Sequence, residues 1–242
     1  MGKASGSQAG QLSLVMRVPP LRVLITGFGP FPGLIVNASE AFAPLLAHRL
    51  PEQVPGLRAA CAILPTEWDR APRLLNKLLN ELQPHLCLHL GVSGSAHGMV
   101  LESVAHNATS QRQDAAGWGP ASSTVIVEAP SSLTGPIGLD QLLKRANGDT
   151  LAVSASVNAG RYVCNAVFFH SLWQARRMGL TGPSRRLTAF LHMPVRVGGE
   201  GQAEDQALNA RDFPLDQALA SAFGVLTAMS QFAPEPDLAA LA

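Results

Sequence analysis

The sequence predicts an α/β fold, specifically a three-layer α/β/α sandwich around a mixed, mostly parallel twisted sheet. From Leu21 onward, short runs with β-branched residues alternate with longer segments in which apolar residues recur at helical spacing. A length of 242 residues, of which 47% are hydrophobic, is enough for one large core. We therefore expect residues 21–242 to form a single domain, preceded by a disordered extension over residues 1–20.

The expected elements alternate along this domain. Strands are expected at 21–26, 57–64, 85–90, 100–106, 150–156 and 187–193, and helices at 37–50, 66–83, 138–146, 161–178 and 215–232. Asn37 can cap the first helix, although Pro44 indicates a late start or a bend. Thr66 and Asp69 form an approximate capping box for the second helix. The stretch 110–123 is a long loop, of the kind that often serves a site.

The charge content restricts the partners. Charged residues make up only 14% of the chain and the net charge is +1, so no strong field exists to attract nucleic acid or an anionic membrane. A small or peptidic partner is expected instead. The low charge also favours a homo-oligomer, a dimer or tetramer, in which part of the surface is covered, although a monomer with an apolar surface would have the same composition.

The cysteines and the N-terminus indicate the compartment. Cys61, Cys87 and Cys164 cannot all pair, and their long spacings match neither a disulfide framework nor a zinc knuckle. The apolar run 12–16 is too short for a signal peptide or a membrane span. A reducing, cytoplasmic location is therefore expected.

Cys164 is the candidate nucleophile. The first turn of a helix favours a thiolate through its unpaired N–H groups and the positive end of the helix dipole. The preceding turn Asn158-Ala159-Gly160 would place the thiol at the carboxyl edge of the sheet, where ligands bind in such folds. The alternative is a packed free cysteine, because the residues around Cys164 are mostly apolar. Position on the helix does not by itself decide between the two.

Several separated segments resemble one known family. Tyr162-Val-Cys-Asn165 after an Ala-Gly pair is similar to the cysteine segment of pyroglutamyl peptidase I, also called pyrrolidone-carboxylate peptidase. The resemblance continues in order through the segments Leu24–Phe31, Pro65-Thr66, Gly91–Asn107 and Leu191–Pro194. It runs from about Leu21 to Pro194, which is most of the chain.

The resemblance implies a catalytic triad of Glu102, Cys164 and His192. In such a triad the histidine takes the thiol proton and later gives one to the leaving amine, while the glutamate holds the imidazole. The implied activity is that of a cysteine omega-peptidase acting on N-terminally pyroglutamylated peptides, with release of free pyroglutamate. No metal or other cofactor is implied. Taken singly, a strand glutamate or a histidine at a strand end can equally be structural.

The resemblance also implies where the substrate binds. Phe28 and Phe31 would sandwich the flat lactam ring, with Thr66, Tyr162 and Val163 nearby. An uncharged aromatic slot suits a lactam, which has no charge to pair. The alternative for Phe28 and Phe31 is two core phenylalanines.

The sequence departs from the family in three places, one of which is the segment Arg112–Ala115, one residue shorter than the family's usual Arg-Ile-Pro-Asp-Asn. Ser95-Ala96 stands where the family usually has Gly-Arg, and Glu102-Ser103 stands where it has Glu-Arg. We expect Arg112 to help stabilise the oxyanion together with the backbone N–H of Cys164. The altered loop leaves open a second hypothesis, a protein that binds pyroglutamyl peptides without cleaving them.

A third hypothesis is a nucleoside-acting relative within the wider phosphorylase/hydrolase-like fold, for which only analogy of fold speaks. The motif 27–33 lacks the glycine spacing of a dinucleotide site, and its two prolines lack the N–H groups that a phosphate needs. The motif 91–95 lacks the second glycine of a serine-hydrolase elbow. His85, Cys87 and His89 alternate on one strand as a possible metal ladder, although a strand buried on both faces explains them better.

Overall fold

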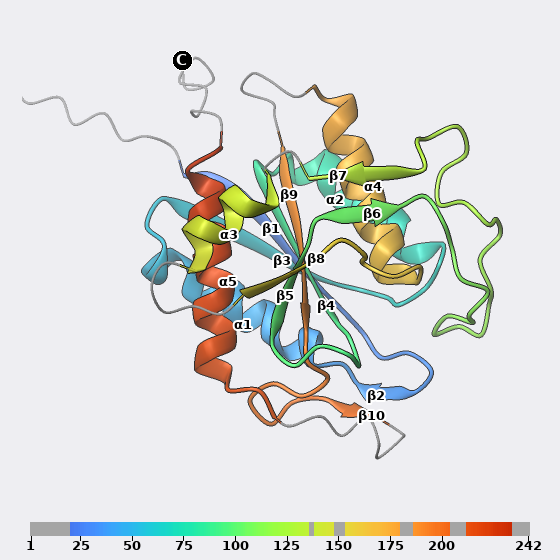
Figure 1. Ribbon diagram of the computed structural model, residues 1–242, viewed down its shortest axis with the longest axis horizontal. Coiled ribbons are helices and arrows are strands. Elements are labelled where there is room, and N and C mark those ends of the chain that lie inside the picture. The colour runs from blue at the N-terminus through green and yellow to red at the C-terminus, as the bar shows by residue number, and fades with distance from the viewer. Residues whose placement is uncertain (1–19, 136–137, 148–152, 180–185, 204–211, 234–242) are drawn as a thin grey trace, which may run out of the picture.

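The fold is described from a computed structural model (Figure 1). The structure describes residues 20–135, 138–147, 153–179, 186–203 and 212–233. The predicted extension over residues 1–20 therefore lies, except for Pro20, outside the described residues. Among the described helices, none is long and apolar enough to cross a membrane.

The centre of the molecule is a six-stranded sheet in the order β3-β1-β4-β9-β5-β8. Four of these strands are parallel to one another, namely β1 (Leu21–Phe28), β3 (Leu57–Leu64), β4 (Leu86–Val92) and β9 (Leu187–Met193). β5 (Met99–Glu102) runs antiparallel to β9, and β8 (Val153–Ser156) is parallel to β5. The sheet is thus mixed and mostly parallel.

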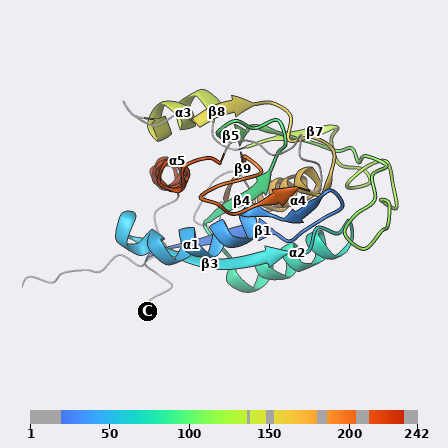
Figure 2. The same cartoon turned by 90° about the horizontal axis from the view of Figure 1, so that it is seen from below.

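Helices cover both faces of this sheet (Figures 1 and 2). α1 (Ala38–Gln53), α3 (Leu139–Asn147) and α5 (Leu215–Ser230) lie on one side, and α2 (Arg70–Leu82) and α4 (Val163–Arg177) on the other. The predicted three-layer α/β/α sandwich is confirmed. The layers follow from the alternation of side chains along each strand, which sends successive residues to opposite faces.

Strand β4 shows how one sequence serves two cores. Leu86, Leu88 and Leu90 pack in the cluster under α1, α3 and α5. Cys87 points the other way, into the cluster under α2 and α4. A strand buried on both faces is normally apolar. A polar side chain on the face toward α4 therefore indicates a role other than packing.

Two small sheets lie beside the central one. β2 (Leu34–Val36) pairs with β10 (Gln202–Ala203), and β6 (Val104–His106) pairs with β7 (Ser132–Thr134). The single strand predicted at 100–106 is therefore wrong. The chain leaves the central sheet after Glu102, and Ser103, whose N–H donates to the Ser156 carbonyl, separates the two strands.

The starts of the first two helices differ from their expectations. α1 begins at Ala38 with the Asn37 side chain accepting from the Ser39 N–H, so Pro44 does not delay it. α2 begins only at Arg70, and Asp69 makes no side-chain capping bond. The capping box is wrong because the Thr66 hydroxyl donates to the Gly29 carbonyl instead, at 2.7 Å.

Candidate active site

Cys164 is the second residue of α4, as the sequence predicted for a thiol in a first helical turn. The chain enters the helix through a turn in which Gly160 has φ of +79° and donates its N–H to the Asn158 side chain at 3.1 Å. A positive φ suits glycine because a Cβ would be strained there. Cys164 is partly exposed, whereas Cys87 is buried. The turn thus brings an accessible thiol to the start of a helix.

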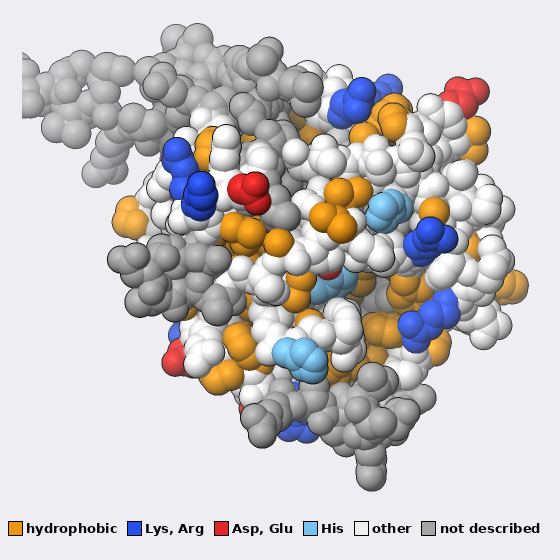
Figure 3. All heavy atoms as spheres, viewed as in Figure 1, with side chains coloured by type: hydrophobic (Ala, Val, Ile, Leu, Met, Phe, Trp, Pro, Cys, Tyr) orange, Lys and Arg blue, Asp and Glu red, His pale blue; other side chains and the backbone are white. Residues whose placement is uncertain are grey.

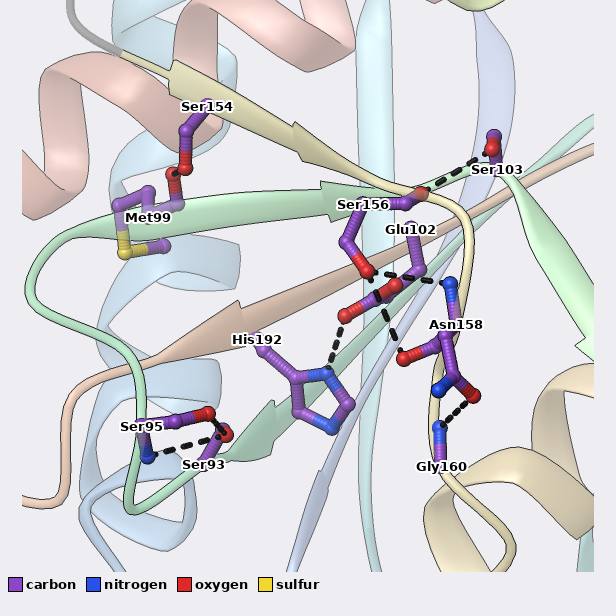
Figure 4. A network of polar contacts seen from close by, with 10 residues as sticks. All are labelled: Ser93, Ser95, Met99, Glu102, Ser103, Ser154, Ser156, Asn158, Gly160 and His192. Carbon is purple, nitrogen blue, oxygen red and sulfur yellow. Dashed lines mark hydrogen bonds and ion pairs between the residues drawn. The ribbon is translucent and has the colours of Figure 1, made fainter.

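His192 and Glu102 meet on two neighbouring antiparallel strands. His192 is the next-to-last residue of β9, and Glu102 is the last residue of β5. The register sets Glu102 opposite Phe190, two residues from His192 and on the same face. The imidazole Nδ1 lies 2.8 Å from Glu102 Oε1, and both side chains are buried. Figure 4 shows the imidazole directed at the carboxylate from below.

The electrostatics around His192 favour a charged imidazole. Burial lowers the pKa of His192, but the hydrogen bonds to Cys164 and Glu102 and the charges of these two groups outweigh it and raise the pKa to about 9. With Nδ1 directed at Glu102, Nε2 is the nitrogen left for the thiol. The second carboxylate oxygen, Glu102 Oε2, is buried and has no hydrogen-bond partner. The three side chains therefore form one connected group.

Gly91 is required for this arrangement. It lies in β4 directly beside His192 of β9, on the face that looks toward α4. A Cβ at this position would lie 3.0 Å from Cys164 Sγ and 2.9 Å from the Phe190 ring, distances that real Cβ atoms almost never show. The sequence places Gly91 in a matching segment, but only the packing shows that its missing side chain makes room for the thiol.

The triad opens into a cavity of about 660 Å³. Its wall is built by the loop after β4, by β5, by the turn before α4 and by the region of β2. Figure 3 shows this hollow in the molecular face, with a histidine at its floor and hydrophobic and basic side chains around it. A cavity of this size accommodates a small organic ligand.

Three of the predicted substrate-binding residues line this cavity, namely Phe31, Tyr162 and Arg112. The rings of Phe31 and Tyr162 lie 5.6 Å apart and are tilted by 56°. The Arg112 guanidinium carbon lies 5.7 Å from the Phe31 ring centroid and 5.1 Å from that of Tyr162. The structure therefore brings these three residues to the same cavity as the triad.

The other three predicted residues lie behind this wall. Phe28 is 1% exposed and packs against Phe190, with the ring centroids 6.4 Å apart. Val163 is fully buried in the same core, and Thr66 is buried with its hydroxyl bonded to Gly29. None of them is among the residues that line the cavity. Direct contact of Phe28, Thr66 and Val163 with a substrate stays a prediction.

Four further residues that the sequence analysis did not predict as site residues line the cavity. Ser93 and Ser95 in the loop after β4 bond each other through their hydroxyls at 3.0 Å. Ser156 and Asn158 line the opposite side, before α4, and Figure 4 shows Ser156 next to Glu102. Serine and asparagine in a loop are too common to mark a site by sequence, so no signal could have selected them.

The long loop predicted at 110–123 is held beside the cavity by Asp114. Its Oδ1 accepts the N–H groups of Ala116 and Trp118, and its Oδ2 accepts the Trp68 N–H at 3.0 Å. The Tyr162 hydroxyl donates to the Gln113 carbonyl at 2.8 Å. Burial raises the pKa of Tyr162 to about 12, with further charge effects from its neighbours, so the phenol keeps its proton. These bonds fix the backbone that carries Arg112.

His85, Cys87 and His89, which alternate on one strand, are not arranged as metal ligands. In the described parts of the chain, no group of three or more His, Cys, Asp or Glu side chains is arranged to hold a metal ion. His85 Nδ1 accepts the Arg22 N–H, and His89 Nδ1 bonds the Thr26 hydroxyl at 2.8 Å. Burial and the charge of Arg186 lower the pKa of His89 to about 3.

The geometry defines a class of protein. A thiol at a helix start, an imidazole behind it and a buried carboxylate that orients the imidazole are the parts of a cysteine hydrolase. The family model of pyroglutamyl peptidase matches residues 21–228. The chain therefore belongs to the pyroglutamyl peptidase family, which is a family of cysteine peptidases.

Individual relatives agree with this assignment. The chain is 32% identical over 185 residues to pyroglutamyl-peptidase 1 of Mus musculus, a match that covers 74% of this chain and 81% of the mouse protein. Two solved structures share the fold. A mutant pyrrolidone carboxyl peptidase from Pyrococcus furiosus matches with a TM-score of 0.73 at 23% identity, over 88% of this chain and all of that one. Pyroglutamyl peptidase I of Bacillus amyloliquefaciens matches with a TM-score of 0.72 at 22% identity, over 90% and 100%.

Proposed function

We propose that this protein is a cysteine omega-peptidase that hydrolyses the amide bond after an N-terminal pyroglutamyl residue. The observation that carries this proposal is the position of His192, whose imidazole interacts with both the Cys164 thiol and the Glu102 carboxylate. Family membership and the names of the relatives supply the substrate class. The products are free pyroglutamate and a peptide with a new amino terminus.

The reaction follows from the roles of these three side chains. His192 takes the proton of Cys164, and the thiolate attacks the carbonyl carbon of pyroglutamate to give a tetrahedral oxyanion. The imidazolium then gives its proton to the leaving nitrogen, the C–N bond breaks and a thioester remains. Water, deprotonated by the same imidazole, attacks the thioester and releases pyroglutamate and the thiol. Glu102 stabilises the imidazolium in both steps without itself taking a proton.

The oxyanion requires hydrogen-bond donors near Cys164. The N–H groups in the first turn of a helix have no intrahelical partner, and Cys164 is the second residue of α4. Its backbone N–H is therefore suited to donate a hydrogen bond to the negative charge that develops on the carbonyl oxygen. A contribution from Arg112 to the same oxyanion is the prediction from the sequence, and the substrate series described below tests it.

The substrate ring would rest on the aromatic part of the cavity. Phe31 and Tyr162 are neighbouring aromatic residues that both line the cavity, and a planar neutral lactam gains from contact with aromatic side chains. Phe28 would act indirectly, by supporting the end of β1 from the core. On this proposal Phe31→Ala raises KM more than it lowers kcat.

The test is hydrolysis of a pyroglutamyl chromogenic amide by the purified protein. Cys164→Ser is expected to lose at least about a thousandfold in kcat, because the hydroxyl is a far weaker nucleophile than the thiolate. Iodoacetamide should inactivate the unmodified protein and also Cys61→Ser, which removes the exposed thiol of β3 and is the matched control. Full activity of Cys164→Ser would refute the assigned nucleophile, and tight substrate binding without turnover by the unmodified protein would favour the non-catalytic hypothesis.

We also propose a homo-oligomer in a reducing compartment. The described surface carries large apolar side chains that are well exposed, among them Trp118 at 73% and Val157 at 66%, which an interface between copies would cover. The three described cysteines are free thiols, as a reducing cytoplasm would keep them. Light scattering coupled to size exclusion measures the mass, and a monomer at micromolar concentration would contradict the oligomer.

A further inference from the structure

We infer that Arg112 gives this enzyme a preference for substrates that carry a carboxylate just beyond the scissile bond. Two kinds of substrate have such a group. In a pyroglutamyl dipeptide it is the C-terminal carboxylate, and in a longer peptide it is the side chain of an acidic residue directly after pyroglutamate. The inference rests on the proposed function and specifies which pyroglutamyl peptides the cavity suits best.

The guanidinium of Arg112 is held in place at the cavity wall. It lies near the faces of two rings, those of Phe31 and Tyr162, and one of its terminal nitrogens, Nη2, donates to the Pro32 carbonyl at 3.2 Å. An arginine restrained by ring contacts and a backbone bond loses little further freedom when it binds a ligand. Its remaining N–H groups form a planar fork that matches the two oxygens of a carboxylate.

No carboxylate of the described residues occupies this fork. The nearest acidic residue along the chain, Asp114, accepts three backbone N–H groups through its two oxygens. Glu102 is buried against His192. Within the described residues Arg112 forms no ion pair, and it is the only lysine or arginine that lines the cavity. The cavity therefore presents a positive charge whose counter-ion is not supplied by its own wall.

The chemistry of the substrate says where that counter-ion would come from. The pyroglutamyl residue is a neutral lactam, and its α-carboxyl group is engaged in the amide bond that the enzyme cleaves. Any negative charge in the substrate must therefore lie beyond the scissile bond. A cavity of about 660 Å³ takes a ligand of drug size, which is larger than the lactam ring alone, so the first residue of the leaving peptide also lies within it.

Two pairs of substrates test the preference and distinguish the two sources of the carboxylate. Pyroglutamyl-alanine is compared with its C-terminal amide, and pyroglutamyl-glutamate amide with pyroglutamyl-glutamine amide, by chromatography of the released pyroglutamate. For at least one pair, kcat/KM of the unmodified protein is expected to be about five- to tenfold higher with the charged member, as for a partly exposed charge-assisted pair. The ratio should fall as the ionic strength rises.

Substitutions of Arg112 then assign the effect. Arg112→Gln is expected to bring the ratio to about one, and Arg112→Lys, which keeps the charge but loses the fork, to an intermediate value. The matched control is Arg177→Gln, which removes the same charge at the far end of α4 and should leave both rate and ratio unchanged. Melting temperatures verify that each variant is folded.

Three outcomes would overturn the inference. These are equal rates within both pairs, a ratio that survives in Arg112→Gln without loss of rate, and a ratio that survives in that variant with an equal loss on all four substrates, which would assign Arg112 to the oxyanion instead. If the unmodified protein cleaves none of the four, the proposed function fails. The affinities of Cys164→Ser for the same pairs then still decide whether Arg112 selects a carboxylate.

Discussion

The charge on Glu102 can be removed without removing its hydrogen bond. In Glu102→Gln the side-chain carbonyl can still accept the proton of His192 Nδ1, so the orientation of the ring is kept while the negative charge is lost. Glu102 is 5% exposed and its carboxylate lies 2.8 Å from the imidazole. The variant therefore isolates the electrostatic part of the contact between β5 and β9.

The size of the effect follows from the position of this pair. Unit charges about 4 Å apart attract by about 4 kcal/mol at an effective dielectric constant of about 20, which corresponds to about three pKa units. A neighbouring opposite charge commonly shifts a pKa by about one to three pH units. His192 has its pKa raised to about 9 by Cys164 and Glu102 together. In Glu102→Gln, Cys164 alone remains to oppose the lowering of the His192 pKa by burial. The pKa of His192 should therefore fall by about one to three pH units.

The assay is the pH dependence of kcat/KM with a neutral pyroglutamyl dipeptide amide. The unmodified protein should lose activity as the pH rises through about 9, because His192 then no longer carries the proton for the leaving nitrogen. In Glu102→Gln this alkaline limb should move down by at least about one pH unit, and kcat at neutral pH should fall at least about tenfold. Glu81→Gln, on the exposed side of α2, is the control.

An alkaline limb that stays in place in Glu102→Gln would refute this account of His192. It would mean that the carboxylate orients the ring but contributes little to its charge. A variant that melts well below the unmodified protein would be replaced by Glu102→Asp, which keeps the charge but shortens the side chain. That variant should keep the limb near its original pH while losing rate through the longer contact.

Three further predictions concern packing and stability. Gly91→Ala should lower kcat at least about tenfold by displacing the Cys164 thiol, whereas Gly98→Ala, where a Cβ meets nothing nearer than 3.6 Å, should not. Asn165→Ala should lower the free energy of unfolding in urea by about 2–3 kcal/mol, because its buried amide makes three hydrogen bonds to the backbone at and after β6. Since the pKa of His192 is raised from 6.5 to about 9, its stabilising contribution is complete below about pH 6.5 and is lost as the pH rises through about 9, roughly 3 kcal/mol in all. The difference in unfolding free energy from His192→Gln should shrink by that amount, and a constant difference would contradict it.

The layers and the order of the elements could be predicted because the sequence alternates at two different periods. Strand β3 and strand β9 were predicted with the bounds that the structure has. The break at Ser103 could not be predicted, since residues 100–106 read as one continuous strand. Its cause is pairing with two different partners, β9 on one side and β7 on the other, which no local pattern contains.

The residues of the triad could be proposed from sequence only through the resemblance to a family. Glu102, Cys164 and His192 lie far apart along the chain, and each alone has an ordinary structural explanation. The residues that line the cavity were harder still to predict, because the fold decides which side chains are exposed there. Phe28 and Phe31 are equally aromatic and three residues apart, yet one faces the core and the other the cavity. Only the direction of the chain after β1 separates the two.

The small sheet of β6 and β7 joins the two ends of the loop formed by residues 107–131. The strands pair directly, Asn107 donates its N–H to the Ser131 carbonyl, and its side chain bonds Ile126 and Ala129. The two ends of the segment 107–131 are thus bonded to each other, in addition to the bonds that its interior makes to Trp68 and Tyr162. Mutations could therefore accumulate in this loop and alter which peptides are accepted while the position of Glu102 stays fixed.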